Sequence, residues 1–152
     1  AYLEQLATFS GPARDPRGWS VAVAYCALLP AQSLPPQRDD LCVVPVSALP
    51  QLPFDHRAIL DAALARVRSK SLYSSLPVHL CVETFTLPQL QQVYENVLGE
   101  PLNKVSFRRK MDEMDWLEAV PGALRGGAHR PAQLYRIKPS FRQELALSPR
   151  GL

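Results

Sequence analysis

The chain has 152 residues, 47% of them hydrophobic and 20% charged, with a formal net charge of +3 at pH 7. This length suits one domain of common size or two small ones. The longest apolar stretch is well short of the roughly twenty residues that a membrane helix needs, which excludes a membrane-spanning protein. The positive charge belongs to the C-terminal part, where residues 99–152 hold ten Lys and Arg against six Asp and Glu. So small an excess does not by itself distinguish a nucleic-acid-binding protein from an ordinary soluble domain.

The first 75 residues predict an α+β unit of strands and one helix. Three apolar runs predict strands, over 3–9, 19–29 and 41–46. The second run is almost entirely apolar, which is typical of a strand that is covered on both faces. Asp55 caps a predicted helix from residue 56 to about residue 70, and the prolines between these segments mark loops.

The three cysteines, Cys26, Cys42 and Cys81, are odd in number and show no CxxC spacing. We interpret them as small core residues in a reducing compartment rather than as zinc ligands. We therefore expect a cytoplasmic protein with no metal site in this chain.

Residues 76–152 predict a second domain that contains two consecutive helices, with 74–84 as the connector between the domains. Thr86 is a suitable N-cap for the first helix, and Gly99 follows its last turn. Asn103 is a suitable N-cap for the second helix. The apolar face of this second helix consists of Phe107, Met111 and Met114.

The other face of the second predicted helix is basic. In a helix-turn-helix, the second helix enters the major groove of DNA with its N-terminal residues nearest the bases. The runs 116–120 and 133–137 predict a hairpin, whose long loop would be a wing that contacts phosphates or the minor groove. Two helices and a hairpin in this order indicate a winged helix-turn-helix that binds duplex DNA. The candidate DNA-binding residues are Lys104, Ser106, Arg108, Arg109 and Lys110 on the helix and Arg125, His129 and Arg130 on the wing.

Several motifs along the chain resemble one known family. Leu3–Leu6 with Phe9, the loop Arg14-Asp15-Pro16-Arg17-Gly18, the strand to Leu28 and the segment 52–60 look like the second half of a Nudix domain. Segments 85–91, 107–110 and 130–136 are similar to the winged-helix half of the Nudix-related transcriptional regulators of NAD metabolism. The resemblance implies a partial Nudix-like α/β sandwich in residues 1–75, followed by a winged helix-turn-helix in 76–152. It also implies a bacterial repressor that binds double-stranded operator DNA as a homodimer and responds to ADP-ribose or a related NAD metabolite.

The Nudix box of that fold, a glycine-led loop and helix whose glutamates hold Mg²⁺, has no counterpart in this chain. In the family's order the box would precede Leu3, so we expect a fragment that starts after it. We therefore expect no catalytic residues here, no hydrolysis of nucleoside diphosphates, and a need for Mg²⁺ only if an intact box exists in the missing part. A Nudix hydrolase of ADP-ribose with an accessory winged helix is the alternative function. A winged helix that serves protein contacts is a further alternative.

Arg14 and Arg17 are the candidate effector-binding residues. They lie in a Pro/Gly loop between two predicted strands, and guanidinium groups suit the bidentate binding of a diphosphate. The alternative is an exposed loop that holds an ion pair between Arg14 and Asp15.

Overall fold

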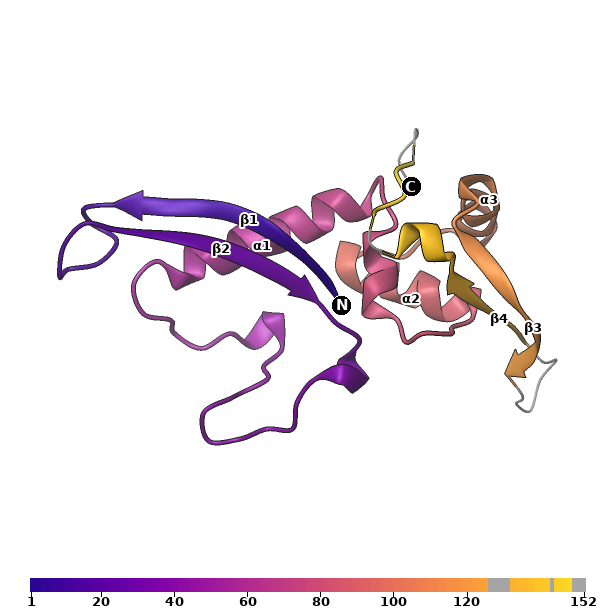
Figure 1. Ribbon diagram of the computed structural model, residues 1–152, viewed down its shortest axis with the longest axis horizontal. Coiled ribbons are helices and arrows are strands. Elements are labelled where there is room, and N and C mark those ends of the chain that lie inside the picture. The colour runs from indigo at the N-terminus through magenta and orange to yellow at the C-terminus, as the bar shows by residue number, and fades with distance from the viewer. Residues whose placement is uncertain (126–131, 143, 149–152) are drawn as a thin grey trace.

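The computed structural model describes residues 1–125, 132–142 and 144–148. The molecule is elongated, with a β-hairpin and one long helix at one end and a winged-helix unit at the other (Figure 1). The prediction of an α+β fold is confirmed. Within the described residues, no helix is both long and apolar enough to cross a membrane. The strands and α-helices are β1 (Tyr2–Gly11), β2 (Ser20–Leu28), α1 (His56–Ser71), α2 (Leu87–Leu98), α3 (Lys104–Met114), β3 (Leu117–Arg125) and β4 (Ala132–Ile137).

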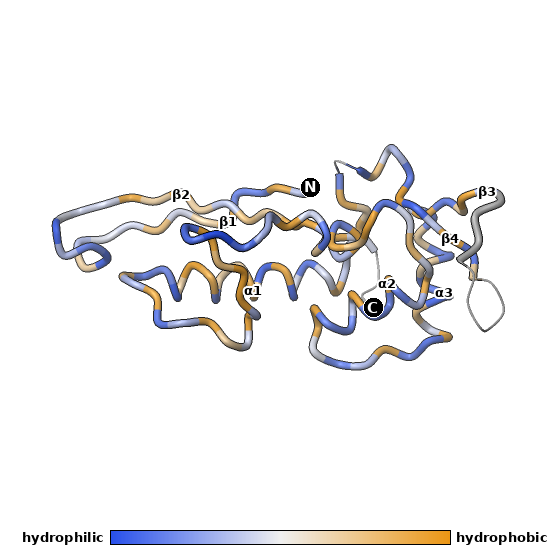
Figure 2. The backbone as a smooth tube through the Cα atoms, turned by 90° about the horizontal axis from the view of Figure 1, so that it is seen from below, coloured by the Kyte–Doolittle hydropathy of each residue, from blue (hydrophilic) through white to orange (hydrophobic). Residues whose placement is uncertain are grey.

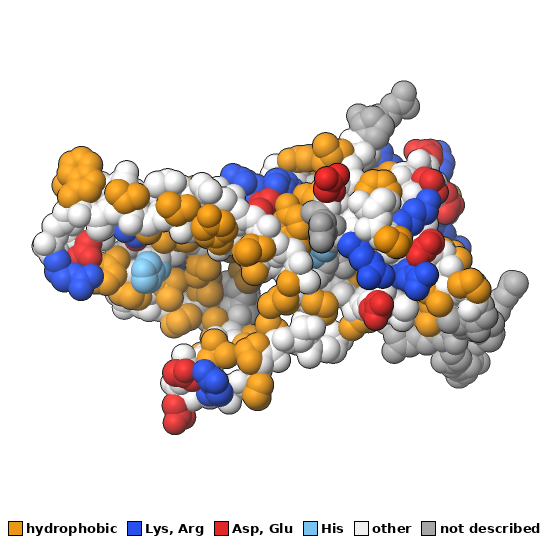
Figure 3. Space-filling model, viewed as in Figure 1, with side chains coloured by type: hydrophobic (Ala, Val, Ile, Leu, Met, Phe, Trp, Pro, Cys, Tyr) orange, Lys and Arg blue, Asp and Glu red, His pale blue; other side chains and the backbone are white. Residues whose placement is uncertain are grey.

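Strands β1 and β2 form a two-stranded antiparallel sheet. Exposure alternates along β2, and the side chains of Val21, Val23 and Tyr25 are exposed. The prediction that this strand is covered on both faces is wrong. Helix α1 runs along one side of the hairpin in both views (Figures 1 and 2), whereas hydrophobic side chains remain uncovered along the hairpin surface (Figure 3).

The segment between β2 and α1 is irregular, so the third predicted strand is wrong. Residues 41–46 make only an isolated bridge from Leu41 to Arg38, and a short 3-10 helix follows over Val46–Ala48. Pro45 interrupts the apolar run and has no N–H to give to a ladder, so the run's β-propensity does not become a strand. Cys42 lies in this segment and is exposed, which corrects its interpretation as a core residue.

Helix α1 is tied to β1 by ion pairs near its C-terminus. Glu4 pairs with Lys70 and, at 3.5 Å, with Arg66, and it accepts a hydrogen bond from the Tyr2 hydroxyl at 2.8 Å. Burial raises the pKa of Glu4, but the hydrogen bonds from Lys70 and Tyr2 outweigh it and bring the pKa below its usual value. Asp55 occupies the N-cap position of α1 as predicted, yet its side chain makes no capping hydrogen bond.

The hydrophobic core lies in the winged-helix unit. Tyr94 of α2 and Trp116 before β3 are fully buried, and the ring of Tyr94 meets that of Phe107 edge-on at 5.5 Å. Helix α2 begins with a capping box between Thr86 and Gln89, and it ends at Gly99 with φ +81°, a conformation that favours glycine. The buried core residues are Val78, Phe85, Leu87, Leu90, Tyr94, Phe107, Met111, Trp116 and Ala146.

The predicted connector, residues 74–84, contributes buried residues to this core. It contains a 3-10 helix, η3, over Leu76–Leu80, whose first three residues are buried. The carbonyl of Ser74 accepts a hydrogen bond from the buried Tyr94 hydroxyl at 2.9 Å. The Ser75 amide and hydroxyl both bond the Ala146 backbone, at 2.9 and 3.0 Å. The end of α1 is thereby fastened to α2 and to the C-terminal segment.

Candidate nucleic-acid interface

The orientation of α3 is set by its N-cap and by two buried side chains. The Asn103 side-chain oxygen accepts hydrogen bonds from the amides of Val105 and Ser106, both at 3.0 Å. Phe107 and Met111 lie one turn apart and are buried against α2 and the hairpin. Because these positions face the core, the opposite face of the helix is turned to solvent. Both predicted features of this helix, its cap and its apolar face, are confirmed.

The predicted basic residues lie along the first two turns of α3. Lys104, Ser106, Arg108 and Arg109 are exposed and Lys110 is half-buried, and Lys and Arg gather at this end of the molecule together with acidic side chains (Figure 3). Asp112 and Glu113 follow, so the positive charge of the helix is confined to residues 104–110. Arg109 lies 3.6 Å from Glu113, but both side chains are largely exposed, and such a pair is weak enough to open.

Val105 was not among the predicted site residues. It stands on the first turn of α3 between the cap and Arg109, and it is 75% exposed. The sequence feature that could have drawn attention to Val105 is its chemistry, because it is a β-branched apolar residue in an otherwise polar helical face. Periodicity alone does not detect it, because the inward positions of the helix are already accounted for.

The predicted hairpin follows α3. Strands β3 and β4 are antiparallel, with Leu117 opposite Ile137 and an irregularity between Ala119 and Leu124. The Arg136 guanidinium pairs with Glu118 across the strands at 2.6 Å. Arg125 ends β3; its side chain lies outside the described residues, as do His129 and Arg130. The contacts of the predicted wing residues therefore remain predictions.

A short backbone pair fixes the hairpin against the start of α2. Phe85 and Tyr135 exchange both backbone hydrogen bonds, at 2.9 and 2.7 Å, and the Lys138 amide donates to the Trp116 carbonyl at 3.0 Å. Helix α3 and the hairpin are thus held by the same core. The described part of the unit therefore places the basic helix α3 beside strands β3 and β4 on a shared core.

The two predicted effector residues each bind a carboxylate. Arg14 contacts Asp55 through two hydrogen bonds, at 2.7 and 3.1 Å, and also donates to the Ser20 hydroxyl at 3.1 Å. Arg17 pairs with Asp15, so the alternative pair between Arg14 and Asp15 is wrong. Hydrogen bonds from Arg17 lower the pKa of Asp15 to about 2. Because Arg14 binds both carboxylate oxygens of Asp55, these oxygens are turned to the guanidinium rather than to the first amides of α1.

An open hollow of about 320 Å³ lies between the β1–β2 loop and the start of α1, and Arg14, Asp15, Arg17 and Ser20 are among the residues that line it. Phe54 borders it in a left-handed backbone conformation (φ +51°) that is unusual for a bulky residue. The Arg17 guanidinium lies 5.8 Å from the centre of the Phe54 ring, and the His56 ring meets that ring edge-on. Arg17 is 81% exposed at its side chain, against 15% for Arg14. Arg17 is therefore the more available of the two cations.

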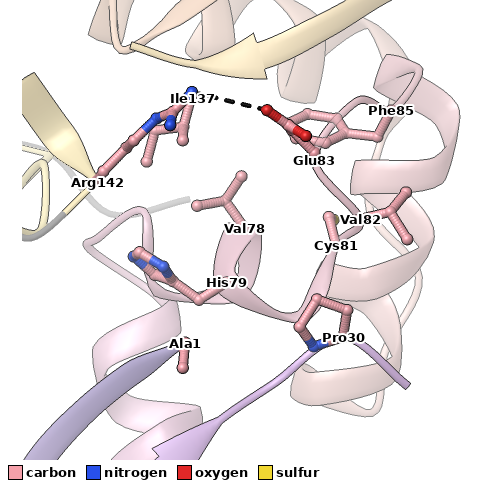
Figure 4. A pocket seen from close by; sticks show the side chains of 10 residues that line it. All are labelled: Ala1, Pro30, Val78, His79, Cys81, Val82, Glu83, Phe85, Ile137 and Arg142. Carbon is pink, nitrogen blue, oxygen red and sulfur yellow. Dashed lines mark ion pairs between the residues drawn. The ribbon is translucent and has the colours of Figure 1, made fainter. Parts of the chain in front are cut away.

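A second hollow, of about 260 Å³, lies where the first strand meets the winged-helix unit (Figure 4). Glu83 and Arg142 face each other across one side of it, at 4.0 Å. His79 lines it too, and burial lowers the pKa of His79. Among the described residues, no group of three or more His, Cys, Asp or Glu is placed to hold a metal ion.

Comparison with known proteins agrees with this geometry. Residues 77–137 match the family model of the NrtR DNA-binding winged helix domain. The chain is 40% identical over 141 residues to the ADPR responsive transcriptional repressor NtrR of Acinetobacter baylyi. That match covers 90% of this chain, which spans only 56% of the length of this relative.

Solved structures extend the likeness to the whole chain. The crystal structure of Shewanella oneidensis NrtR matches with a TM-score of 0.83 and 39% identity, covering 99% of this chain and 70% of that one. The same protein in complex with a 27mer DNA matches equally well. A MutT/nudix family protein from Enterococcus faecalis shares the fold, with a TM-score of 0.70 over 90% of this chain and 62% of its own, at 24% identity. With its basic α3 on a winged-helix core and an α+β unit in front of it, the chain belongs to the NrtR family.

Proposed function

We propose that this chain is the operator-binding part of a transcriptional repressor whose affinity for DNA is lowered by an ADP-ribose-like effector. Residues 76–152 bind the DNA and residues 1–75 belong to the effector unit. The observation that carries the proposal is the exposed basic half of α3, held at a fixed angle by Phe107 and Met111. The Acinetobacter relative is a repressor responsive to ADPR, and the Shewanella relative has been solved in complex with a 27mer DNA.

The charges on α3 lead to a quantitative test. A protein that neutralises Z phosphates loses affinity with salt at a log–log slope of about −0.9Z. Arg109→Ala should therefore make the slope shallower by about 0.9. We would measure binding to a duplex selected from random-sequence DNA, by fluorescence anisotropy at several salt concentrations.

Arg57 provides a matched control for Arg109. It lies on α1, is exposed, and pairs with Asp61 four residues later at 3.0 Å, as Arg109 pairs with Glu113. Arg57→Ala removes the same charge from the same kind of pair and should leave the slope unchanged. Equal slopes for the two variants, or wild-type binding that does not respond to salt, would contradict the proposal.

The effector part of the proposal rests on the hollow lined by Arg14 and Arg17. A ligand releases DNA only by the difference in its affinity for the DNA-competent and incompetent forms. We propose that the protein binds adjacent operator half-sites as a homodimer and that the effector changes how the two winged helices are presented. The hydrogen bonds of Ser74 with Tyr94 and of Ser75 with Ala146 support this coupling, because they connect the end of α1 rigidly to the winged-helix unit and so transmit rigid-body movement.

Arg17→Ala is the cleaner variant for testing this part, because Arg14 is largely buried in its pair with Asp55. Arg38 is the matched control: it is exposed and binds Asp40 through two hydrogen bonds, two residues apart, as Arg17 binds Asp15. ADP-ribose should weaken DNA binding by the wild type and by Arg38→Ala, and do so less in Arg17→Ala. Calorimetry would measure ADP-ribose binding directly. If ADP-ribose binds and DNA affinity does not change, the sensor role fails while DNA binding stands.

We also propose that this chain does not hydrolyse ADP-ribose. Phosphoryl chemistry of that kind needs several carboxylates around Mg²⁺, and Glu4, Asp15 and Asp55 are each engaged by arginine or lysine. Metal-dependent release of AMP from ADP-ribose by the purified 152-residue chain would contradict this statement.

A further inference from the structure

The side chain of Val105 is exposed at a position where neither folding nor solubility favours it. Its exposure of 75% is the highest among the large hydrophobic side chains of the described residues. A single exposed apolar residue is ordinary on a protein surface. Val105, however, is also β-branched and helical, and such residues form helices less readily than Ala, Lys or Gln. The residue therefore adds no core packing and lowers the helix propensity of the first turn of α3.

The position of Val105 places it with the candidate DNA-contacting residues. It is the second residue of α3, and Arg109 lies one turn further along the same outward face. In helix-turn-helix proteins the N-terminal residues of the second helix lie nearest the base edges. Lys104 precedes Val105 directly and Arg108 follows it by three positions, about one helical turn. Their charges suit phosphates, which position the protein without reading sequence.

A valine side chain neither donates nor accepts a hydrogen bond, so it reads only an apolar group. In the major groove that apolar group is the C5-methyl of thymine, which cytosine, adenine and guanine lack. We propose that Val105 contacts a thymine methyl and is a specificity-determining residue of the DNA site. This inference rests on the proposed function, because it requires α3 to lie in the major groove.

Deoxyuridine provides the test, since it differs from thymidine only by the missing methyl group. A duplex would be selected from random-sequence DNA with the full 152-residue chain, and each thymine of the selected site would be replaced in turn by deoxyuridine. For the wild type, one position per half-site should weaken binding about fourfold, the factor that corresponds to burial of one methyl group. Val105→Ala should bind the thymine and deoxyuridine duplexes with equal affinity at that position, and its salt slope should match that of the wild type.

Val21→Ala is the matched control. It truncates another exposed valine, 61% exposed on β2, and should keep the wild-type response to deoxyuridine. Wild-type binding that is indifferent to every deoxyuridine refutes the inference and leaves the proposed function standing. Binding with no sequence preference refutes both, because a repressor must distinguish its operator from other DNA. A response to deoxyuridine that persists in Val105→Ala also refutes the inference, because another side chain then reads the methyl. No binding to duplex DNA under any salt condition refutes the proposed function itself.

Discussion

The hydroxyl of Tyr94 connects the two parts of the molecule, and its removal has a definite expected cost. Tyr94 is fully buried, and its hydroxyl donates to the carbonyl of Ser74 at 2.9 Å, three residues after the end of α1. Tyr94→Phe keeps the ring and its edge-on contact with Phe107 while it removes the donor. A buried acceptor that loses its partner costs about 1–3 kcal/mol. For a chain of this length, a loss near 2 kcal/mol corresponds to a melting temperature lower by about 4–8 °C.

Urea denaturation followed by tryptophan fluorescence would measure this change in the free energy of unfolding. Tyr25→Phe is the matched control, because Tyr25 is 61% exposed on β2 and its hydroxyl removal should change stability by less than about 0.5 kcal/mol. If Tyr94→Phe is as stable as this control, the bond between α2 and Ser74 does not hold the joint in solution.

The pH dependence gives a second and independent readout. Burial raises the pKa of Tyr94 above its usual value near 10. The folded state then disfavours the phenolate, so its stability is fully present below that usual value and is lost as the pH rises above it. The loss of folding stability at alkaline pH that comes from Tyr94 should be absent in Tyr94→Phe, which has no hydroxyl to ionise at this position. An unchanged alkaline slope would show that Tyr94 does not titrate in a buried site.

Two further predictions concern the core and the ion pairs of α1. Phe107→Ala should lower the free energy of unfolding by about 3–5 kcal/mol, because it opens a cavity against Tyr94. Val105→Ala on the same helix should leave the free energy of unfolding within about 0.5 kcal/mol of the wild type. Equal effects of the two variants in denaturant titrations would contradict the assigned faces of α3. Glu4→Gln should lose about 1–3 kcal/mol at pH 7, because Lys70 loses its charged partner. Since the pKa of Glu4 is lowered in the folded state, its contribution is present above its usual pKa and lost as the pH falls through the folded value. The variant should approach the wild type in acid, and a stability difference that is constant between pH 7 and pH 3 would exclude the charge as the cause.

The features that sequence reasoning predicted well depend on contacts between near neighbours. Thr86, Gly99 and Asn103 mark helix ends because their caps join residues within a few positions of one another. Phe107 and Met111 were assigned to the core because helical periodicity places them on one face. The basic face of α3 follows from the same periodicity, and so does the prediction of a DNA-binding helix.

Other features required the tertiary structure, because they depend on which distant segment comes near. Arg14 meets Asp55 across 41 positions and Lys70 meets Glu4 across 66, and the local pattern offered Asp15 to Arg14 equally well. Residues 41–46 have the composition of a strand, but a strand needs a partner along its length, and in the described chain only Leu41 has one, in its bridge to Arg38. Sequence by itself determined the helices and, for α2 and α3, their caps and buried faces, since these follow from local backbone geometry. Only the tertiary structure decided the ion-pair partners, the open face of β2 and the burial of the Ser74–Ser75 joint, since each depends on contacts between distant parts of the chain.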